Sequence, residues 1–376
     1  MKRTVTIKDV AQKAGCGVAT VSRVLNGSGA TSAKTRERVF AAADSLGFVF
    51  SDIGRSLQSS RTRTLGCIVP SLANPVFADA VQGLQNVAQN SGYQMLLACS
   101  NYNEKDETEA VRLLLAKHVD GIVLTVSDVE NSAALEMILQ REIPACLMFN
   151  KPHGSIPASG IDNFAAAKAV AEAFHHMGHT DTGFLALRFR SSDRSRERFE
   201  GFAAGCRDFG MSDPQLLEID EQSGDLSRLL HDLLSESAQL TGIFASNDFL
   251  ALAAIRAAKE LGRRVPEDLS IVGFDGIEIG RMVEPSLATI VTDARAMGSL
   301  AARYVLDHLS KADNPTSSQS ETETKAAMPA LGLSYHFRPG ASLDAPGGKN
   351  KDGAEAATST PSRHLVPNPL LNSQGE

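Results

Sequence analysis

Four side chains near the N-terminus have types and a spacing that could read the sequence of double-stranded DNA. On a short helical pattern starting at residue 18, Val21 and Leu25 fall on the inward face. The outward face then presents Val18, Ala19, Ser22 and Arg23. An arginine offers paired N–H donors to a guanine edge, and small apolar side chains contact thymine methyl groups. The chemistry predicted for this face is contact with base edges in the major groove.

Two helices separated by a glycine turn would be needed to position that face. Thr6 and Asp9 have the spacing of a capping box at the start of the first helix. A third helix is expected from a cap at Thr31 or Ser32 to about Leu46. The pattern predicts a helix-turn-helix, whose second helix lies in the major groove. An ordinary helical hairpin is the alternative that this pattern alone leaves open.

The charge distribution separates the N-terminal segment from the rest of the chain. The 376 residues carry a formal net charge of −7, which at first argues against nucleic acid as a partner. Residues 1–64, however, contain eleven Lys and Arg against four Asp and Glu, so this segment carries +7 and the remainder −14. A basic head on an acidic body is typical of a DNA-binding module joined to a sensor.

Composition argues against several other classes. Hydrophobic residues make up 43% of the chain without a long apolar run, which indicates a soluble protein and no membrane partner. The five cysteines are scattered, and the chain starts without a signal-peptide pattern, so we expect a reducing, cytoplasmic location. His175, His176 and His179 fit a helix end better than a metal site, and we expect no metal and no cofactor.

The segment 6–26 reads T-I-K-D-V-A-Q-K-A-G-C-G-V-A-T-V-S-R-V-L-N and resembles the N-terminus of the lactose-repressor (LacI/GalR) family of bacterial transcription regulators. It departs from the family pattern chiefly at Cys16 and Gly17. The likeness continues through Ser32-Ala-Lys-Thr-Arg-Glu-Arg-Val and Leu46-Gly-Phe, and then over the following chain to about Arg338.

This resemblance implies a domain organisation. An all-α helix-turn-helix head would occupy residues 1–50 and a hinge helix or linker residues 51–63. An α/β periplasmic-binding-protein-like core of two doubly wound parallel-sheet lobes would occupy residues 64–340. Residues 341–376 are rich in Ala, Gly, Ser, Asn and Pro, and we expect them to form a disordered tail.

The resemblance also implies which residues contact DNA. Val18 and Ala19 stand at the positions that largely decide operator choice, and Arg23 would read a guanine. In the hinge, Leu57 would wedge into the minor groove with Arg55 near a phosphate, although a plain linker is the alternative. The implied set is Thr6, Gly17, Val18, Ala19, Thr20, Ser22, Arg23, Asn26, Ser32, Lys34, Thr35, Arg55 and Leu57.

From residue 65 onward, short apolar runs alternate with amphipathic segments, which predicts parallel sheets with helices on both faces. The predicted strands are Leu65–Pro70, Gln94–Ala98, Gly121–Thr125, Ala145–Phe149, Thr182–Leu187, Gly242–Ala245 and Ser270–Phe274. The resemblance makes this two lobes, with crossovers near residues 163 and 292 and a return near 330.

Polar residues follow several of these strands, at the edge where open α/β sheets bind ligands. The predicted effector-binding residues are Ser71, Asn74, Phe77, Thr125, Asn150, Arg198, Asn247 and Asp275. Carboxylate, amide and guanidinium groups facing an aromatic ring suit a sugar, because each hydroxyl both donates and accepts. Taken singly each is more often a turn or cap residue, and Arg198 and Asp275 are the two we favour.

The loop after Thr182–Leu187 is unusually basic. Arg190, Arg194 or Arg196 could add a second cation for a carboxylate or a phosphate, which suggests a sugar acid or sugar phosphate as effector. A solvated charged loop is the alternative.

The sequence therefore predicts a homodimeric repressor that binds a palindromic DNA operator and responds to a small sugar-like effector. A sugar transport component would need an export signal and no basic head. An enzyme would need a nucleophile–base pair, a phosphate loop or metal spacing, and none is evident. An architectural DNA-binding protein would show no response to a ligand. Inducer and corepressor logic are both compatible with these residues.

Overall fold

The computed structural model describes residues 5–26, 29–48, 61–219, 225–313 and 330–348. The chain divides into two compact units, Met1–Arg63 and Thr64–Glu376, which we call the head and the body. Each unit is described by itself.

The head consists of three helices, α1 (Ile7–Ala14), α2 (Val18–Asn26) and α3 (Ala33–Leu46). The capping box starts α1: the Thr6 amide donates to Asp9 Oδ2 at 2.8 Å. Gly15 ends α1 at φ +62°, a left-handed conformation that glycine adopts without strain. Ser32 caps α3 by accepting from the Thr35 amide at 3.2 Å. The predicted helix-turn-helix is confirmed.

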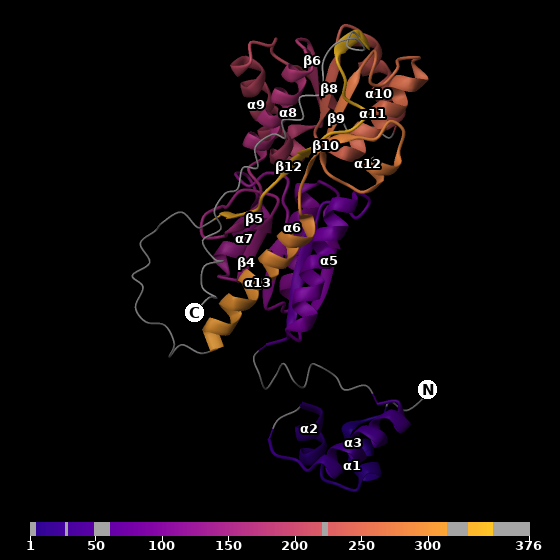
Figure 1. Ribbon diagram of the computed structural model, residues 1–376. Coiled ribbons are helices and arrows are strands. Elements are labelled where there is room, and N and C mark those ends of the chain that lie inside the picture. Colours follow the sequence, from indigo (N-terminus) through magenta and orange to yellow (C-terminus); the bar gives the residue numbers. More distant parts are fainter. Residues whose placement is uncertain (1–4, 27–28, 49–60, 220–224, 314–329, 349–376) are drawn as a thin grey trace, which may run out of the picture. The chain divides into compact units, whose positions relative to one another are not determined.

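The body contains two six-stranded sheets, one in each lobe (Figure 1). The sheet of the first lobe has the order β11-β5-β4-β3-β1-β2 and is parallel throughout. Its strands are β1 (Thr64–Val69), β2 (Gln94–Cys99), β3 (Gly121–Leu124), β4 (Ala145–Met148), β5 (Ala158–Gly160) and β11 (Ala330–Gly332).

The sheet of the second lobe has the order β12-β10-β9-β8-β6-β7, with β12 antiparallel to β10 and the other pairs parallel. Its strands are β6 (Thr182–Leu187), β7 (Gln215–Ile219), β8 (Gly242–Ala245), β9 (Ser270–Asp275), β10 (Ala288–Val291) and β12 (His336–Arg338). All seven predicted strands are present within a residue or so of their predicted ends, and the predicted two-lobed parallel-sheet fold is confirmed.

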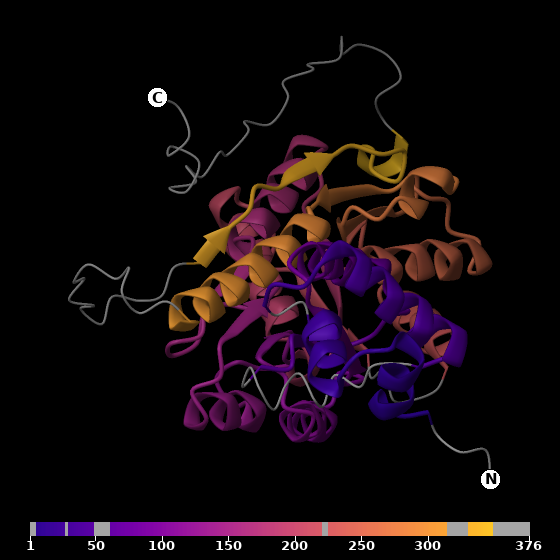
Figure 2. The same ribbon diagram turned by 90° about the horizontal axis from the view of Figure 1, so that it is seen from below.

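Helices cover both sheets (Figure 2). The helices of the first lobe are α5 (Pro75–Asn90), α6 (Glu104–Ala116), α7 (Ala133–Gln140) and α13 (Ala294–Asp313). Those of the second lobe are α8 (Asn163–His176), α9 (Asp193–Asp208), α10 (Leu226–Glu236), α11 (Asp248–Glu260) and α12 (Ile279–Met282), with the short 3-10 turns η1 (Phe189–Ser191) and η4 (Pro346–Gly348). Apolar clusters fill the space between helices and sheets, including Leu65, Cys67 and Val123 in the first lobe.

The chain passes between the lobes three times. It crosses between β5 and α8, between β10 and α13, and between β11 and β12, in agreement with the predicted crossovers near 163, 292 and 330. Since α13 packs against α5, the long C-terminal helix belongs to the first lobe although it follows a strand of the second (Figure 1). A pocket between the lobes can therefore respond to movement at all three connections.

The folded body extends past residue 340, where the sequence predicts the tail to begin. Ser342 is fully buried, and its hydroxyl donates to the Ile271 carbonyl at 2.5 Å and accepts from the Ala288 amide at 2.9 Å. His179 Nε2 lies 2.9 Å from the Asp344 carbonyl oxygen. Residues 341–348 pack on the second lobe through these bonds, which a composition rich in small residues does not reveal. The remainder of the predicted tail lies outside the described residues.

Candidate DNA-binding head and effector pocket

The outward face of α2 carries the residues that the sequence places there. Val18, Ala19 and Arg23 are exposed, whereas Val21 and Val24 are buried in the core of the head. Val18 is 42% exposed, so its side chain is accessible to a partner.

The residues predicted to contact phosphates belong to all three helices of the head and to the residues next to them. Thr6 and Ser32 cap α1 and α3, Lys34 is exposed, and Thr20, Ser22 and Thr35 are half-buried. Gly17, one residue before α2, has open space where a Cβ would be. Asn26 ends α2, and its side chain, like Arg55 and Leu57 of the predicted hinge, lies outside the described residues. That these residues contact DNA stays a prediction.

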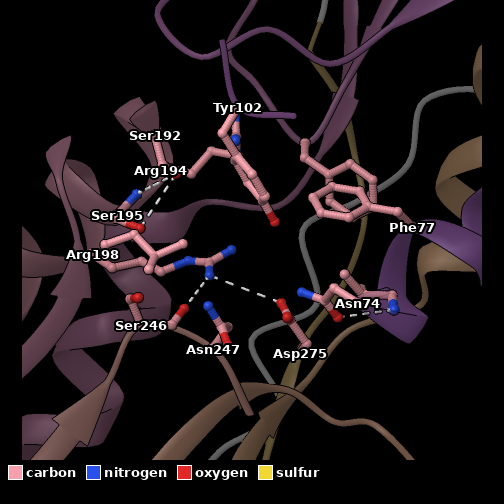
Figure 3. A pocket seen from close by; sticks show the side chains of 13 residues that line it. Asn74, Phe77, Tyr102, Ser192, Arg194, Ser195, Arg198, Ser246, Asn247 and Asp275 are labelled. Carbon is pink, nitrogen blue, oxygen red and sulfur yellow. Dashed lines mark hydrogen bonds and ion pairs between the residues drawn. The ribbon is translucent and has the colours of Figure 1, made fainter. Parts of the chain in front are cut away.

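The body has a partly open pocket between its lobes, with about 420 Å³ of empty space including the solvent at its mouth. It is lined by Asn74, Val76, Phe77, Tyr102, Phe149, Leu187, Ser192, Arg194, Ser195, Arg198, Ser246, Asn247 and Asp275. Phe77 and Tyr102 lie on one side, across from Arg198, Asn247 and Asp275 (Figure 3). The polar residues follow β1, β6, β8 and β9, at the carboxyl ends of the strands.

Five of the eight predicted effector residues line this pocket: Asn74, Phe77, Arg198, Asn247 and Asp275. Asn74 and Asn247 are also N-caps, because their side-chain oxygens accept from the amides of Val76 and Leu250. From the sequence, a helix-capping role and a position in the pocket are alternatives for each of these asparagines. In the structure, each of the two side chains has both.

Arg198 is held from three sides. Its Nε donates to Asn163 Oδ1 at 2.8 Å, its Nη1 donates to the Ser246 carbonyl at 2.5 Å, and its guanidinium lies 3.6 Å from the centre of the Phe274 ring. Nη1 is also 3.8 Å from Asp275 Oδ1 (Figure 3). Burial lowers the pKa of Arg198 to about 10, so the group stays charged at neutral pH. A cation fixed this firmly can orient a ligand.

Asp275 ends β9 in a left-handed conformation, φ +109°. Burial raises its pKa to about 6, against the opposing effects of Arg198 and a hydrogen bond from the Asn74 side chain. Behind it, Asp248 Oδ2 accepts from the amides of Gly276 and Ile277, both at 2.8 Å, and its Oδ1 accepts from the Thr289 hydroxyl at 2.6 Å. Asp248 thereby fixes the turn that follows Asp275, although it does not line the pocket.

The structure places the other three predicted effector residues outside the lining. Ser71 Oγ accepts from the Ala73 amide at 3.1 Å in the turn after β1. The Thr125 hydroxyl donates to the Met148 carbonyl at 3.0 Å and so joins the ends of β3 and β4. Asn150 bonds both polar groups of the Val126 backbone at 3.0 Å. Thr125 and Asn150 hold neighbouring strand ends together, Ser71 stabilises a local turn, and none of the three lines the cavity.

Asn150 also takes part in a bonded contact between the lobes, which we call the inter-lobe brace (Val126, Asn150, Asp193 and Arg194). Asn150 Nδ2 donates to both oxygens of Asp193 at 3.0 and 3.1 Å. Arg194 Nη1 donates to the Val126 carbonyl at 2.7 Å and lies 3.1 Å from Asp193 Oδ1. Asp193 and Arg194 begin α9 of the second lobe, so this brace ties α9 to the strand ends of the first lobe.

Several pocket residues were not predicted. Tyr102 and Phe149 have positive φ angles in turns after β2 and β4, a conformation that the sequence does not signal. Ser192, Ser195 and Ser246 are common residues whose position beside Arg194 and Arg198 could have suggested a role. Of the three arginines proposed for the basic loop, only Arg194 lines the pocket.

Among the residues that the structure describes, no group of His, Cys, Asp and Glu could hold a metal ion. No helix in that part of the chain is long and apolar enough to cross a bilayer.

A helix-turn-helix head followed by a two-lobed ligand-binding body defines a ligand-responsive transcription regulator as the class of protein. The family described as bacterial regulatory proteins, lacI family, matches residues 6–51, and the periplasmic binding protein-like domain matches residues 171–327. The chain is 33% identical over 308 residues to the HTH-type transcriptional regulator GntR of Escherichia coli K12, covering 81% of this chain and 92% of that one.

Solved structures agree with this assignment. The lac repressor dimer bound to operator and an anti-inducer has a TM-score of 0.77 at 25% identity, covering 91% of this chain and all of that one. The complex of the transcriptional regulator CelR with cellobiose has a TM-score of 0.63 at 26% identity, covering 90% and 100%. The chain belongs to the lacI family of bacterial regulatory proteins, and it is a DNA-binding transcription regulator rather than an enzyme.

Proposed function

We propose that this protein is a cytoplasmic repressor that binds a palindromic operator as a homodimer and is controlled by a sugar-like effector between the lobes of its body. The pocket around Arg198 and Asp275, on the same chain as an exposed helix-turn-helix face, is the observation that carries this proposal. The lac repressor in its structure is a dimer on operator DNA, and CelR holds cellobiose.

On the DNA, α2 would lie in the major groove. Val18 and Ala19 would contact thymine methyl groups, and Arg23 would donate to a guanine. The Arg23 side chain now lies along its own helix, with Nε 3.3 Å from the Ala19 carbonyl oxygen, a weak bond that a base contact can replace. A homodimer presents two such helices about one helical turn of DNA apart, which requires a palindromic operator.

The dimer would use exposed apolar side chains of the body. Leu96 and Leu97 are 39% and 37% exposed on β2, the edge strand of the first sheet, and Leu113 on the neighbouring α6 is 54% exposed. In the second lobe, Phe249 on α11 and Met282 on α12 are 50% and 75% exposed. Large apolar side chains exposed in groups mark interaction surfaces, and an uncovered edge strand invites pairing.

The effector would act by changing how the lobes meet. The pocket takes Phe77 and Phe149 from the first lobe and Arg198 and Asp275 from the second, so a bound ligand contacts both. A ligand that binds one arrangement of the lobes better shifts the equilibrium toward that arrangement, and the connection to the head transmits the shift.

The experiment that tests this proposal is selection of bound duplexes from a random DNA pool with the purified full-length protein. We expect an enriched palindrome of two half-sites, with Arg23→Gln relaxing the preference at one base pair of each half-site. Replacing the exposed Lys34, which would contact a phosphate, should weaken binding about equally for all sequences. Enrichment of a single, non-palindromic site would contradict the dimer, and no enrichment with or without pooled sugars would contradict operator binding.

A further inference from the structure

The hydrogen-bonding groups of the pocket are unequally divided between donors and acceptors. Asn74 Oδ1 accepts from the Val76 amide at 3.2 Å, and Asn247 Oδ1 accepts from the Leu250 amide at 2.9 Å. Asn247 therefore offers a ligand mainly its NH₂ group, and Asn74, whose side chain also donates to Asp275, offers the remaining N–H. Asp275 is the one acidic side chain in the lining, against two arginines.

Arg194 lines the pocket and has one guanidinium edge without a hydrogen-bond partner. Its Nη1 is used by the Val126 carbonyl and Asp193, whereas Nε and Nη2 have no hydrogen-bond acceptor among the described residues. The side chain as a whole is only 6% exposed and lines the cavity, so it has little contact with bulk water. Charged donors that no protein group uses are available to an acceptor on a ligand, and such charge-assisted bonds are strong where bulk water is limited.

Asp193 does not close this edge. Its oxygens accept from Asn150 Nδ2 and from the Val129 amide at 3.2 Å, so it stays on the side of the brace. There it fixes the plane of the Arg194 guanidinium through Nη1. The Nε and Nη2 N–H groups that remain point in parallel along one edge, and this is the arrangement that accepts the two oxygens of a carboxylate.

Ser246 supplies a second, independent sign of a missing ligand group. Ser246 lines the pocket, and its Oγ is fully buried and has no hydrogen-bond partner among the described residues. A hydroxyl can donate and accept, so it suits a ligand hydroxyl next to Arg198.

We propose, building on the function proposed above, that the effector is a sugar acid whose carboxylate is bound bidentately by Nε and Nη2 of Arg194, with its hydroxyls against Arg198, Ser246 and Asp275. A phosphate ester fits less well. It carries up to two negative charges beside the Asp275 carboxylate, and the lining contains no third cation to balance them.

The test is calorimetric titration of the full-length protein, without DNA, with matched ligands of five and six carbons. Each aldonic acid is compared with the alditol that has CH₂OH in place of the carboxylate, and with the corresponding aldose phosphate. At least one aldonic acid should bind about tenfold or more tightly than its alditol and its phosphate. Equal or tighter binding of the neutral ligand, tighter binding of the phosphate, or no binding of any acid overturns the proposal.

Two arginine variants locate the preference. Arg194→Gln should bring acid and alditol to within about threefold of each other, and Arg194→Lys, which keeps the charge but loses the paired donors, should fall between. Arg190→Gln is the matched control, because Arg190 is exposed in the same loop and lies outside the pocket. An undiminished preference for the acid in folded Arg194→Gln would overturn the assignment. Operator selection, whose readout is the enriched DNA sequence rather than ligand affinity, tests the proposed function separately.

Discussion

Replacing Asn150 with alanine distinguishes its observed place in the inter-lobe brace from the effector contact that the sequence predicts. The change removes the acceptor of the Val126 amide at 3.0 Å and a donor to the Asp193 carboxylate at 3.0 Å. The Val126 carbonyl keeps Arg194, and Asp193 keeps Arg194 and the Val129 amide, so one backbone N–H is left without a partner. An unpaired buried N–H and a lost bond to a charged group each cost roughly 1–3 kcal/mol. Because the two losses share one site and the surroundings relax, we expect about 3 kcal/mol.

The assay is urea denaturation of the full-length protein followed by circular dichroism, with thermal denaturation alongside. For a domain of this size about 3 kcal/mol corresponds to a fall in Tm of roughly 6 °C. Asn131→Ala is the control: its Nδ2 donates to Asp128 Oδ2 at 2.9 Å, but the side chain is exposed and water replaces the bond. That variant should lose less than about 0.5 kcal/mol.

The reasoning is refuted if Asn150→Ala unfolds at the same urea concentration as the wild type. Unchanged stability together with lost ligand binding would mean that Asn150 contacts the effector directly. A loss of stability with ligand binding reduced only moderately is the result that a brace requires.

Three further predictions follow from buried or exposed groups. Ser246→Ala should leave the ligand-free protein as stable as the wild type or more stable, because the Oγ is unpartnered, and a destabilisation above about 1 kcal/mol in thermal denaturation would show a hidden partner. Leu97→Lys should weaken the dimer at least tenfold in sedimentation, while Met177→Lys, at an equally exposed apolar position on the second lobe, should not; equal effects would place the interface elsewhere. Burial raises the pKa of Asp275 to about 6, so the folded state keeps a proton that the unfolded state releases near pH 4. The unfolding free energy should therefore decrease as pH rises from about 4 to 6, with a smaller decrease in Asp275→Asn, and identical slopes in denaturation at several pH values would contradict this.

The fold was predictable from the sequence where strands are long and apolar. Thr182–Leu187 and Ser270–Asp275 are buried along their length, and continuous burial leaves a run of apolar residues in the sequence. The strands that escaped prediction are short or half-exposed: Ala158–Gly160 has three residues, and Gln215–Ile219 alternates with exposed positions at a sheet edge. Whether these short segments form strands depends on the strands that they pair with, and the local sequence does not indicate those partners.

The sequence predicts at which edge of the sheets the site lies. It does not predict the direction in which each side chain at that edge points. The rule that polar residues at the ends of parallel strands bind ligands correctly predicted that Asp275, Asn74 and Asn247 lie in the pocket. The same rule placed Thr125 and Asn150 there, although both turn toward a neighbouring strand end. The direction is set by the backbone that follows each strand, and a positive φ, such as that of Phe149, is a tertiary outcome for a residue other than glycine.

The first turns of α9 contain both the inter-lobe brace and the pocket, and this arrangement gives a physical route for coupling. Arg194 bonds the Val126 carbonyl of the first lobe with Nη1, the same side chain lines the pocket, and Arg198 follows one turn later. A guanidinium is rigid and planar, so a ligand held along its free edge fixes the direction of Nη1 as well. Any ligand that also contacts Arg198 and Asp275 ties that direction to the position of the second lobe. The two lobes then cannot shift without straining either the bond to Val126 or the contacts to the ligand, and differential strain of this kind is what a coupling free energy between effector and operator requires.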